Sequence, residues 1–182
     1  MKGVIFQSLE GLVLTHRDMA CWNQLLAKNA PKDRAYVSVN NYPDQELNAL
    51  VSDICIELQL SRAKVLNQFG RYLFNYFMKH YSVVVGHYSH FEALILNIDS
   101  VIHKEVSKLY QNTNLPTMDC MMVCPGHIVM HYQSPRQLCF LAEGLIYGAG
   151  EYFLMDVTIE HEQCLLREDE RCTLNIYYQP AK

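Results

Sequence analysis

Apolar residues recur three and four positions apart over the first half of the chain, the spacing that places them on one face of a helix. Over residues 9–30 this spacing predicts two short helices, which Pro31 closes. We expect another helix to begin at Tyr42-Pro43-Asp44 and a further one after Ser61, whose hydroxyl suits a helix cap. Residues 36–39 are expected to form a brief extended piece. The N-terminal part of the chain is therefore predicted to be helical.

The longest apolar stripe covers residues 89–110 and predicts one amphipathic helix, with His103 near its C-terminal end. After Pro116 the pattern changes to alternating and β-branched residues, which are typical of strands. The elements expected there are strands over 117–123 and 128–132 joined by a Pro-Gly turn, a helix over 135–152, and strands over 155–160 and 173–178. The predicted fold class is α+β, with a helical N-terminal part and an antiparallel sheet in the C-terminal part.

Length and composition favour one globular domain that spans residues 1–182. Half of the residues are apolar, which is enough for a sizeable core. The formal net charge of -4 arises from scattered charges of both signs, without a basic block that could neutralise a nucleic-acid backbone. No apolar run approaches the roughly 20 residues of a membrane span. We therefore expect a cytoplasmic protein that binds neither nucleic acid nor membranes.

Candidate chemistry first appears at His103 and at the sequence Tyr132-Gln133-Ser134-Pro135-Arg136. A haem iron needs a neutral imidazole on a stiff element, and a histidine on a long helix supplies one. Two hydroxyls and a guanidinium stand at every second position where a strand passes into a helix, on Tyr132, Ser134 and Arg136. Together these groups can hold a pair of carboxylates. The plainer alternative is a histidine of the core or surface, together with a Ser134 that caps the helix and a solvated Arg136.

These residues belong to a pattern that covers essentially the whole chain. It consists of Met1-Lys2-Gly3 with Ile5, Phe69-Gly70-Arg71, Val101-Ile102-His103, Lys108-Leu109-Tyr110, Leu115-Pro116 and the Tyr-x-Ser-x-Arg motif. With this pattern the chain resembles the haem nitric oxide/oxygen-binding (H-NOX) family, which is related to the sensory domain of soluble guanylate cyclases. The resemblance implies the H-NOX fold, in which haem b lies buried between a distal helical part, about 1–62, and a proximal part, about 63–182.

The resemblance also implies roles for individual residues. His103 would be the proximal ligand of the haem iron. The haem propionates would be bound by Tyr132, Ser134 and Arg136. Ile5 and Pro116 would press on the porphyrin and distort it, although a core isoleucine and a loop-ending proline are the plainer interpretation.

Distal hydrogen-bond donors determine which gas such a haem holds, because O₂ gains from a donated hydrogen bond whereas NO binds ferrous haem strongly without one. In family members that keep O₂, a tyrosine lies nine residues beyond the motif tyrosine, and this position is Leu141 here. The matching positions near the first helix and after Phe-Gly-Arg are Leu9 and Leu73. These apolar residues favour a selective NO sensor that binds CO more weakly. Tyr147 is a possible substitute donor, although helical spacing does not require it to face the haem.

The resemblance implies a sensor rather than an enzyme. NO on one face of the haem would weaken the bond from the iron to His103. Release of His103 from the iron would let the histidine helix shift relative to the N-terminal helices. Such a shift transmits a signal only if a partner binds the two shapes with different affinity. The chain contains no kinase, cyclase or phosphodiesterase domain, so we expect a separate histidine kinase or cyclic-di-GMP enzyme as the partner, as is typical of stand-alone bacterial members.

A second candidate site lies late in the chain, where five of the seven cysteines fall from residue 120 onward. One nitrogen and three sulfurs are available there, from Cys139, His161, Cys164 and Cys172. This donor set suits tetrahedral Zn²⁺. It is similar to a structural zinc site in some members of the family. The alternative is three reduced cysteines near a surface histidine, with Cys120-x-x-x-Cys124 close enough to compete for metal. Oxidation of zinc thiolates releases the metal, so a redox input at this site is a further hypothesis.

Other classes of protein remain open from the sequence. A haem enzyme, such as a peroxidase or an NO dioxygenase, would need distal acid–base groups beside the iron, whereas the positions assigned to the distal side are apolar. An O₂-binding haem protein is a second alternative. A haem-free, zinc-thiolate interaction domain with redox sensing as its only input is the third.

Overall fold

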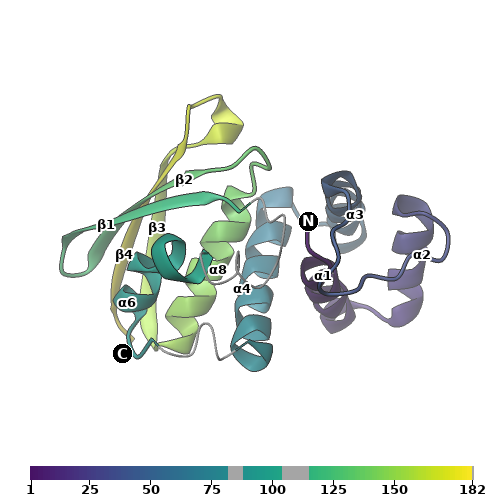
Figure 1. Ribbon diagram of the computed structural model, residues 1–182, viewed down its shortest axis with the longest axis horizontal. Helices are drawn as coiled ribbons and strands as arrows, with labels where there is room; N and C mark the ends of the chain where they lie inside the picture. Colours follow the sequence, from purple (N-terminus) through teal and green to yellow (C-terminus); the bar gives the residue numbers. More distant parts are fainter. Residues whose placement is uncertain (82–87, 104–114, 182) are drawn as a thin grey trace.

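Helices come first and strands follow in the part of the chain that the computed structural model describes, residues 1–81, 88–103 and 115–181 (Figure 1). The elements are the helices α1 (Gly3–His16), α2 (Met19–Asn29), α3 (Asp44–Leu58), α4 (Arg62–His80) and α6 (Phe91–Leu96), the π-helical turn η1 (Ile98–His103), the strands β1 (Thr117–Cys124) and β2 (His127–Gln133), helix α8 (Cys139–Tyr152), strand β3 (Met155–Gln163), the 3₁₀ turn η2 (Leu165–Arg167) and strand β4 (Cys172–Pro180). The predicted α+β class is confirmed.

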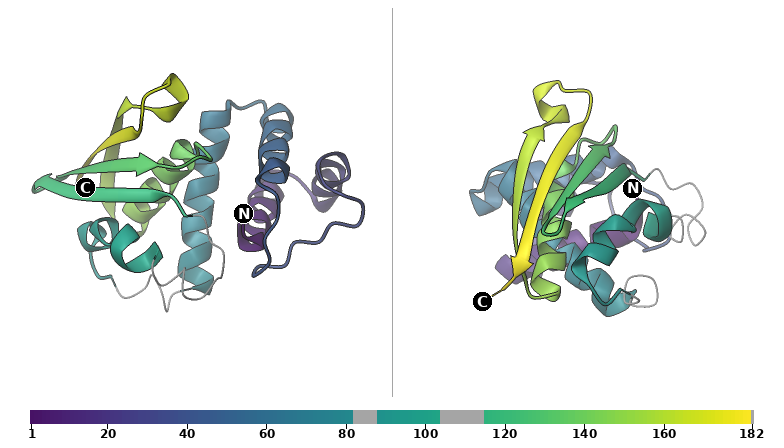
Figure 2. Two further views of the ribbon diagram at one scale, coloured as in Figure 1. Left: turned by 45° about the horizontal axis from the view of Figure 1, so that its top comes forward. Right: turned by 90° about the vertical axis from the view of Figure 1, so that its left-hand side faces the viewer.

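The four strands form one antiparallel sheet in the order β1-β2-β4-β3. Side chains alternate between its faces, and in β2 the buried positions are Ile128, Met130 and Tyr132. Helix α8 covers the face on which these side chains lie (Figure 2). Tyr132, which belongs to the motif, therefore points toward the helix that follows it in the chain.

Helix α4 stands between the sheet part and the bundle of α1, α2 and α3, as both figures show. It packs against α8 with the two backbones in contact, because a Cβ atom on Gly144 would lie 2.8 Å from the Cα of Gly70. Leu66 and Phe69 of α4 are buried in the helical core, and Phe74 is buried in the core beneath the sheet. Each such side chain stabilises the fold by roughly 1.5–3 kcal/mol. None of the described helices is both long and apolar enough to cross a bilayer.

The helix predicted over 89–110 is interrupted. α6 ends at Leu96, and the side-chain amide of Asn97 donates to the carbonyl of Ala93 at 2.8 Å. A side chain that bonds locally in this way competes with the regular helical pattern. The chain continues as η1, with His103 as its last residue. Residues 104–110 of the predicted helix, with Lys108-Leu109-Tyr110, lie outside the described residues.

Two other predicted boundaries also differ. The helix expected from residue 135 begins at Cys139, because Gln137 has a left-handed backbone (φ 52°) and the N–H of Leu138 is donated to the Tyr132 hydroxyl. Ser134 therefore lies in a turn that precedes α8. The segment 36–39 pairs with none of the described strands, although an isolated bridge joins Lys2 and Asn41 nearby.

Candidate functional site

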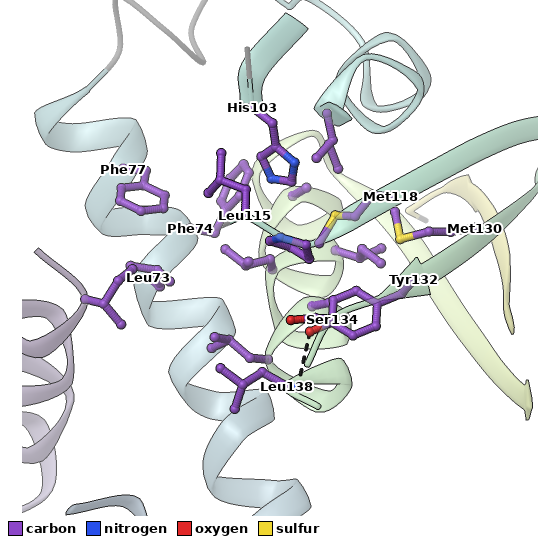
Figure 3. Close-up of a pocket in the computed structure, with 18 of the residues that line it drawn as sticks. Leu73, Phe74, Phe77, His103, Leu115, Met118, Met130, Tyr132, Ser134 and Leu138 are labelled. Atoms are coloured by element: carbon purple, nitrogen blue, oxygen red, sulfur yellow. Dashed lines mark hydrogen bonds between the residues drawn. The ribbon is translucent and has the colours of Figure 1, made fainter. Parts of the chain in front are cut away.

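A cavity of about 280 Å³ lies where α4, α8, η1 and the first two strands meet (Figure 3). Side chains from α1 complete its wall, which is apolar almost throughout. Among the lining residues, the polar side chains are those of Tyr81, His103, Tyr132, Ser134 and Arg136. The fold therefore brings four residues that the sequence singled out to one apolar pocket, although more than thirty positions separate the first from the last. These residues are His103, Tyr132, Ser134 and Arg136.

His103 enters the cavity from the end of η1. Its Nδ1 lies 3.0 Å from Oδ1 of Asp99, one turn earlier in the same element. A carboxylate at this position accepts the Nδ1 proton, which leaves the lone pair of the neutral ring on Nε2. The side chain is 17% exposed, so the ring is mostly shielded from water. His103 thus lies in the cavity wall with its ring oriented by Asp99.

Tyr132 and Ser134 are buried, with 2% and 6% of their surface exposed. The Tyr132 hydroxyl accepts a hydrogen bond from the backbone N–H of Leu138 at 3.2 Å, and the two hydroxyl oxygens lie close together in Figure 3. Burial raises the pKa of Tyr132 to about 12, against hydrogen bonds from Ser134 and Leu138 that lower it. The phenol therefore keeps its proton at neutral pH and can donate it to a carboxylate.

Arg136 is held by a carboxylate rather than solvated. Its Nε lies 2.7 Å from Oδ2 of Asp44, at the start of α3, and its side chain is 16% exposed. Asp44 also accepts a hydrogen bond from the Met1 ammonium at 2.8 Å. Burial acts to raise the pKa of Asp44, but the bonds from Met1 and Arg136 bring it below its ordinary value. The solvated Arg136 of the plainer interpretation is therefore wrong.

The residues assigned to the distal side separate into two groups. Leu73 and Leu141 line the cavity, whereas Leu9 is fully buried in the helical core and is not among the lining residues. Ile5 and Pro116 also line the cavity. Tyr147 is not part of the described lining, and the guanidinium of Arg71 lies over its ring at 4.5 Å from the centroid.

Tyr81 is a cavity residue that the sequence analysis missed. It lies at the C-terminal end of α4, and its ring contacts Phe77 edge-on with centroids 5.8 Å apart. The signal was present in the spacing, because Phe74, Phe77 and Tyr81 stand at i, i+3 and i+7 and all three line the cavity. Tyr81 brings a hydroxyl to a wall that was predicted to be apolar.

The fold also brings together the residues of the second candidate site. The ligand atoms of four residues lie within 4.8 Å of one another, and these residues are Cys139, His161, Cys164 and Cys172. The three cysteines are buried, and the Sγ atoms of Cys139 and Cys164 are 3.8 Å apart. Burial raises the pKa of the Cys139 and Cys172 thiols, and the neighbouring thiols raise that of Cys139 further. Among the described residues this is the group with metal-ligand geometry, and Cys120 and Cys124 lie outside it on β1.

Glu143 is a further residue that sequence reasoning missed. It lies on α8, and its Oε1 is 2.7 Å from Nδ1 of His161. The Nε2 atom of His161 is buried without a hydrogen-bond partner. A glutamate one turn after Cys139 is the sequence signal that could have found it.

A family model described as Haem-NO-binding matches residues 2–161. The chain belongs to the H-NOX family. H-NOX domains are haem-based gas sensors, so the resemblance stated from the motif residues is confirmed. A comparison with curated proteins found no match.

Solved H-NOX structures match nearly the full length of the chain. The chain is 40% identical to an H-NOX protein from S. oneidensis in the Fe(II)NO ligation state, over 98% of this chain and 99% of that chain, with a TM-score of 0.95. An NMR structure of an H-NOX domain from Shewanella oneidensis in the Fe(II)CO state gives 40% identity, coverage of 98% and 99%, and a TM-score of 0.92. An unliganded Fe(II) H-NOX protein from K. algicida is 20% identical, with a TM-score of 0.85 over 98% of this chain and 97% of that chain, and supports the fold alone.

Proposed function

We propose that this H-NOX protein is a nitric oxide sensor that binds haem b through His103, releases this histidine when NO binds and thereby regulates a separate signalling protein. The observation that carries the proposal is the convergence of His103 with Tyr132, Ser134 and Arg136 on one apolar cavity. When bound, ferrous haem would supply an iron that can take a diatomic gas, and His103 would be its protein ligand. The signalling protein that would read this event is a histidine kinase or a cyclic-di-GMP enzyme.

The residues of the cavity fit haem in three respects. Its apolar wall suits the porphyrin, with Ile5 and Pro116 positioned to contact the ring. His103 offers a neutral nitrogen that Asp99 orients. The hydroxyls of Tyr132 and Ser134 and the guanidinium of Arg136 donate to carboxylates, as the propionates require.

Selectivity for NO follows from the lack of distal donors at Leu73 and Leu141, which both face the cavity. O₂ would be held weakly there, whereas NO needs no donated hydrogen bond. CO is expected to bind as well, as it does in the Fe(II)CO structure of the Shewanella domain. Tyr81 brings a further hydroxyl to the cavity wall besides those of Tyr132 and Ser134, and a hydrogen bond from it to bound O₂ would reverse this preference. The Tyr81→Phe variant is therefore a required control.

We propose a Zn²⁺ ion for the second site, held by Cys139, His161, Cys164 and Cys172. The donor set is the one zinc favours, and the buried Nε2 of His161 without a partner fits a position that a metal satisfies. Closure of such a site between α8 and the β3–β4 hairpin would stabilise the fold. Oxidation of its thiolates would release the ion, which gives the protein a second, redox input.

Haem binding through His103 is tested with the His103→Gly variant, with and without added imidazole. Wild-type protein is expected to hold ferrous haem with a nitrogen ligand. The variant should lose this ligand, and imidazole that enters the vacated space should restore the spectrum. A variant spectrum identical to that of wild type without imidazole would show that another residue binds the iron.

A further inference from the structure

We propose that Glu143 is a positioning residue for the second site: its carboxylate fixes His161 in the tautomer and orientation that direct Nε2 toward the three thiols. This inference rests on the zinc site proposed above. It assigns a role to a residue of α8 that supplies no metal ligand of its own.

The contact between Glu143 and His161 sets which ring nitrogen is available. Oε1 of Glu143 lies 2.7 Å from Nδ1 of His161, so the carboxylate accepts the Nδ1 proton of a neutral ring. The other nitrogen, Nε2, is buried and has no hydrogen-bond partner. A ring oriented in this way offers a metal the lone pair of Nε2.

Both residues are shielded from water. The side chains of His161 and Glu143 are 13% and 12% exposed. A buried carboxylate is rare unless it is paired, and the described partner of this one is His161. Phe140 also contacts the His161 ring edge-on, with centroids 5.8 Å apart. Two residues of α8 therefore hold one imidazole that belongs to β3.

Helix α8 places the carboxylate next to the thiol cluster. Cys139 and Glu143 are four residues apart and so lie on one face of the helix, one above the other. Cys139 supplies a sulfur ligand, and Glu143 orients the Nε2 atom of His161. One turn of α8 thus carries both residues. In metal sites generally, a histidine ligand donates its second ring proton to such a partner, and loss of the partner weakens metal binding by 10–100-fold.

A solely structural role is the competing explanation, because the hydrogen bond between Glu143 and His161 also fastens α8 to β3. The two roles differ in what they predict for the metal. If Glu143 only joined α8 to β3, its loss would change the free energy of unfolding, and either ring nitrogen of His161 could bind the metal. A positioning residue defines the nitrogen, and its loss lowers metal affinity while the haem spectrum is retained.

The direct test is a two-bond ¹⁵N–¹H spectrum of the histidine rings in wild-type protein loaded with Zn²⁺. We expect His161 to carry its proton on Nδ1 and the metal on Nε2. Coordination through Nδ1 would overturn the proposal. Because this measurement uses the unaltered protein, it does not depend on whether any variant folds.

Zinc affinity, measured by competition with a chromophoric chelator, gives the second test. Glu143→Leu should lower the affinity by about 10–100-fold, and Glu143→Gln, whose amide oxygen still accepts the Nδ1 proton, should stay within a few-fold of wild type. Glu151→Gln and Glu151→Leu on the same helix are the matched controls, since Glu151 is exposed and pairs with Arg71. Equal affinity in Glu143→Leu and wild type would refute the positioning role. Wild-type protein that takes up no zinc would instead refute the zinc site itself.

Discussion

Tyr132 and Cys172 are paired directly opposite each other on β2 and β4, so the Tyr-x-Ser-x-Arg motif and the thiol cluster meet on neighbouring strands of the sheet. A second contact connects the motif to the thiol cluster at the start of α8. There the backbone N–H of Leu138 donates a hydrogen bond to the Tyr132 hydroxyl, and the next residue is Cys139. A change at either site therefore acts on the same few residues.

Asp99 is predicted to strengthen the bond between His103 and the haem iron. A carboxylate that accepts the Nδ1 proton makes the imidazole a better donor. Asp99→Ala should therefore lower the iron–histidine stretching frequency in the resonance Raman spectrum of the ferrous protein. Asp99→Asn, which keeps an acceptor for the proton, should give a smaller shift. An unchanged frequency in Asp99→Ala would show that the 3.0 Å contact has no effect on the ligand.

A distal donor is predicted to convert the protein to an O₂ binder. Leu141 lines the cavity, so Leu141→Tyr would bring a hydroxyl to the wall. Reduced Leu141→Tyr should form an oxy complex in air, which wild type should not form. The control is Leu141→Phe, which adds the ring without the hydroxyl. If Leu141→Phe holds O₂ as well, the size of the ring and not the hydrogen bond is responsible.

The carboxylate of Asp44 is predicted to stabilise the fold at neutral pH by pairing with Arg136 and the Met1 ammonium. Its pKa in the folded protein is below the ordinary value of about 3.9, so its contribution is present above pH 4 and is lost as the pH falls through the folded pKa. Asp44→Asn should lower the free energy of unfolding by about 1 kcal/mol at pH 7, since the side chain is partly exposed.

This difference between wild type and Asp44→Asn should shrink below pH 4, as urea unfolding at several pH values would reveal. Asp33→Asn is the control, because Asp33 is exposed. A difference that persists undiminished at pH 2 would mean that the charge of Asp44 is not the cause.

The close crossing of α4 and α8 is predicted to tolerate no side chain at Gly144. A Cβ atom there would lie 2.2 Å from the carbonyl oxygen of Asn67, which is backbone and cannot move alone. Gly144→Ala should cost about 1–3 kcal/mol of unfolding free energy, measured by urea denaturation. Gly11→Ala should cost less, because its Cβ would meet the far end of Tyr72, which can move. Equal losses in the two variants would contradict the packing argument.

The sequence predicted the order of the elements better than it predicted their boundaries. Alternation of apolar residues and the cap at Ser61 were sufficient for the order of elements, because both are local. The break at Asn97 depends on a side chain that bonds to its own backbone, which periodicity does not report. The late start of α8 depends on a hydrogen bond from Leu138 to Tyr132, across six residues.

The candidate sites show the same division. His103 and the Tyr-x-Ser-x-Arg residues were visible as motifs. Asp44 was not, since it acts through a contact that only the folded chain creates. Tyr81 and Glu143 had a signal in their helical spacing, but spacing alone does not tell which neighbour each side chain contacts. Arg136 and Asp44 are 92 positions apart, and no local pattern links them.

The proposed function depends on the release of His103 when NO binds to ferrous haem. The most direct test is the absorption spectrum of the reduced protein under argon, in air and after addition of NO. We expect the spectrum of the reduced haem to stay unchanged in air. With NO we expect a five-coordinate spectrum, from which the signature of the nitrogen ligand is lost. A stable oxy complex, or an NO complex that keeps the histidine ligand, would contradict it.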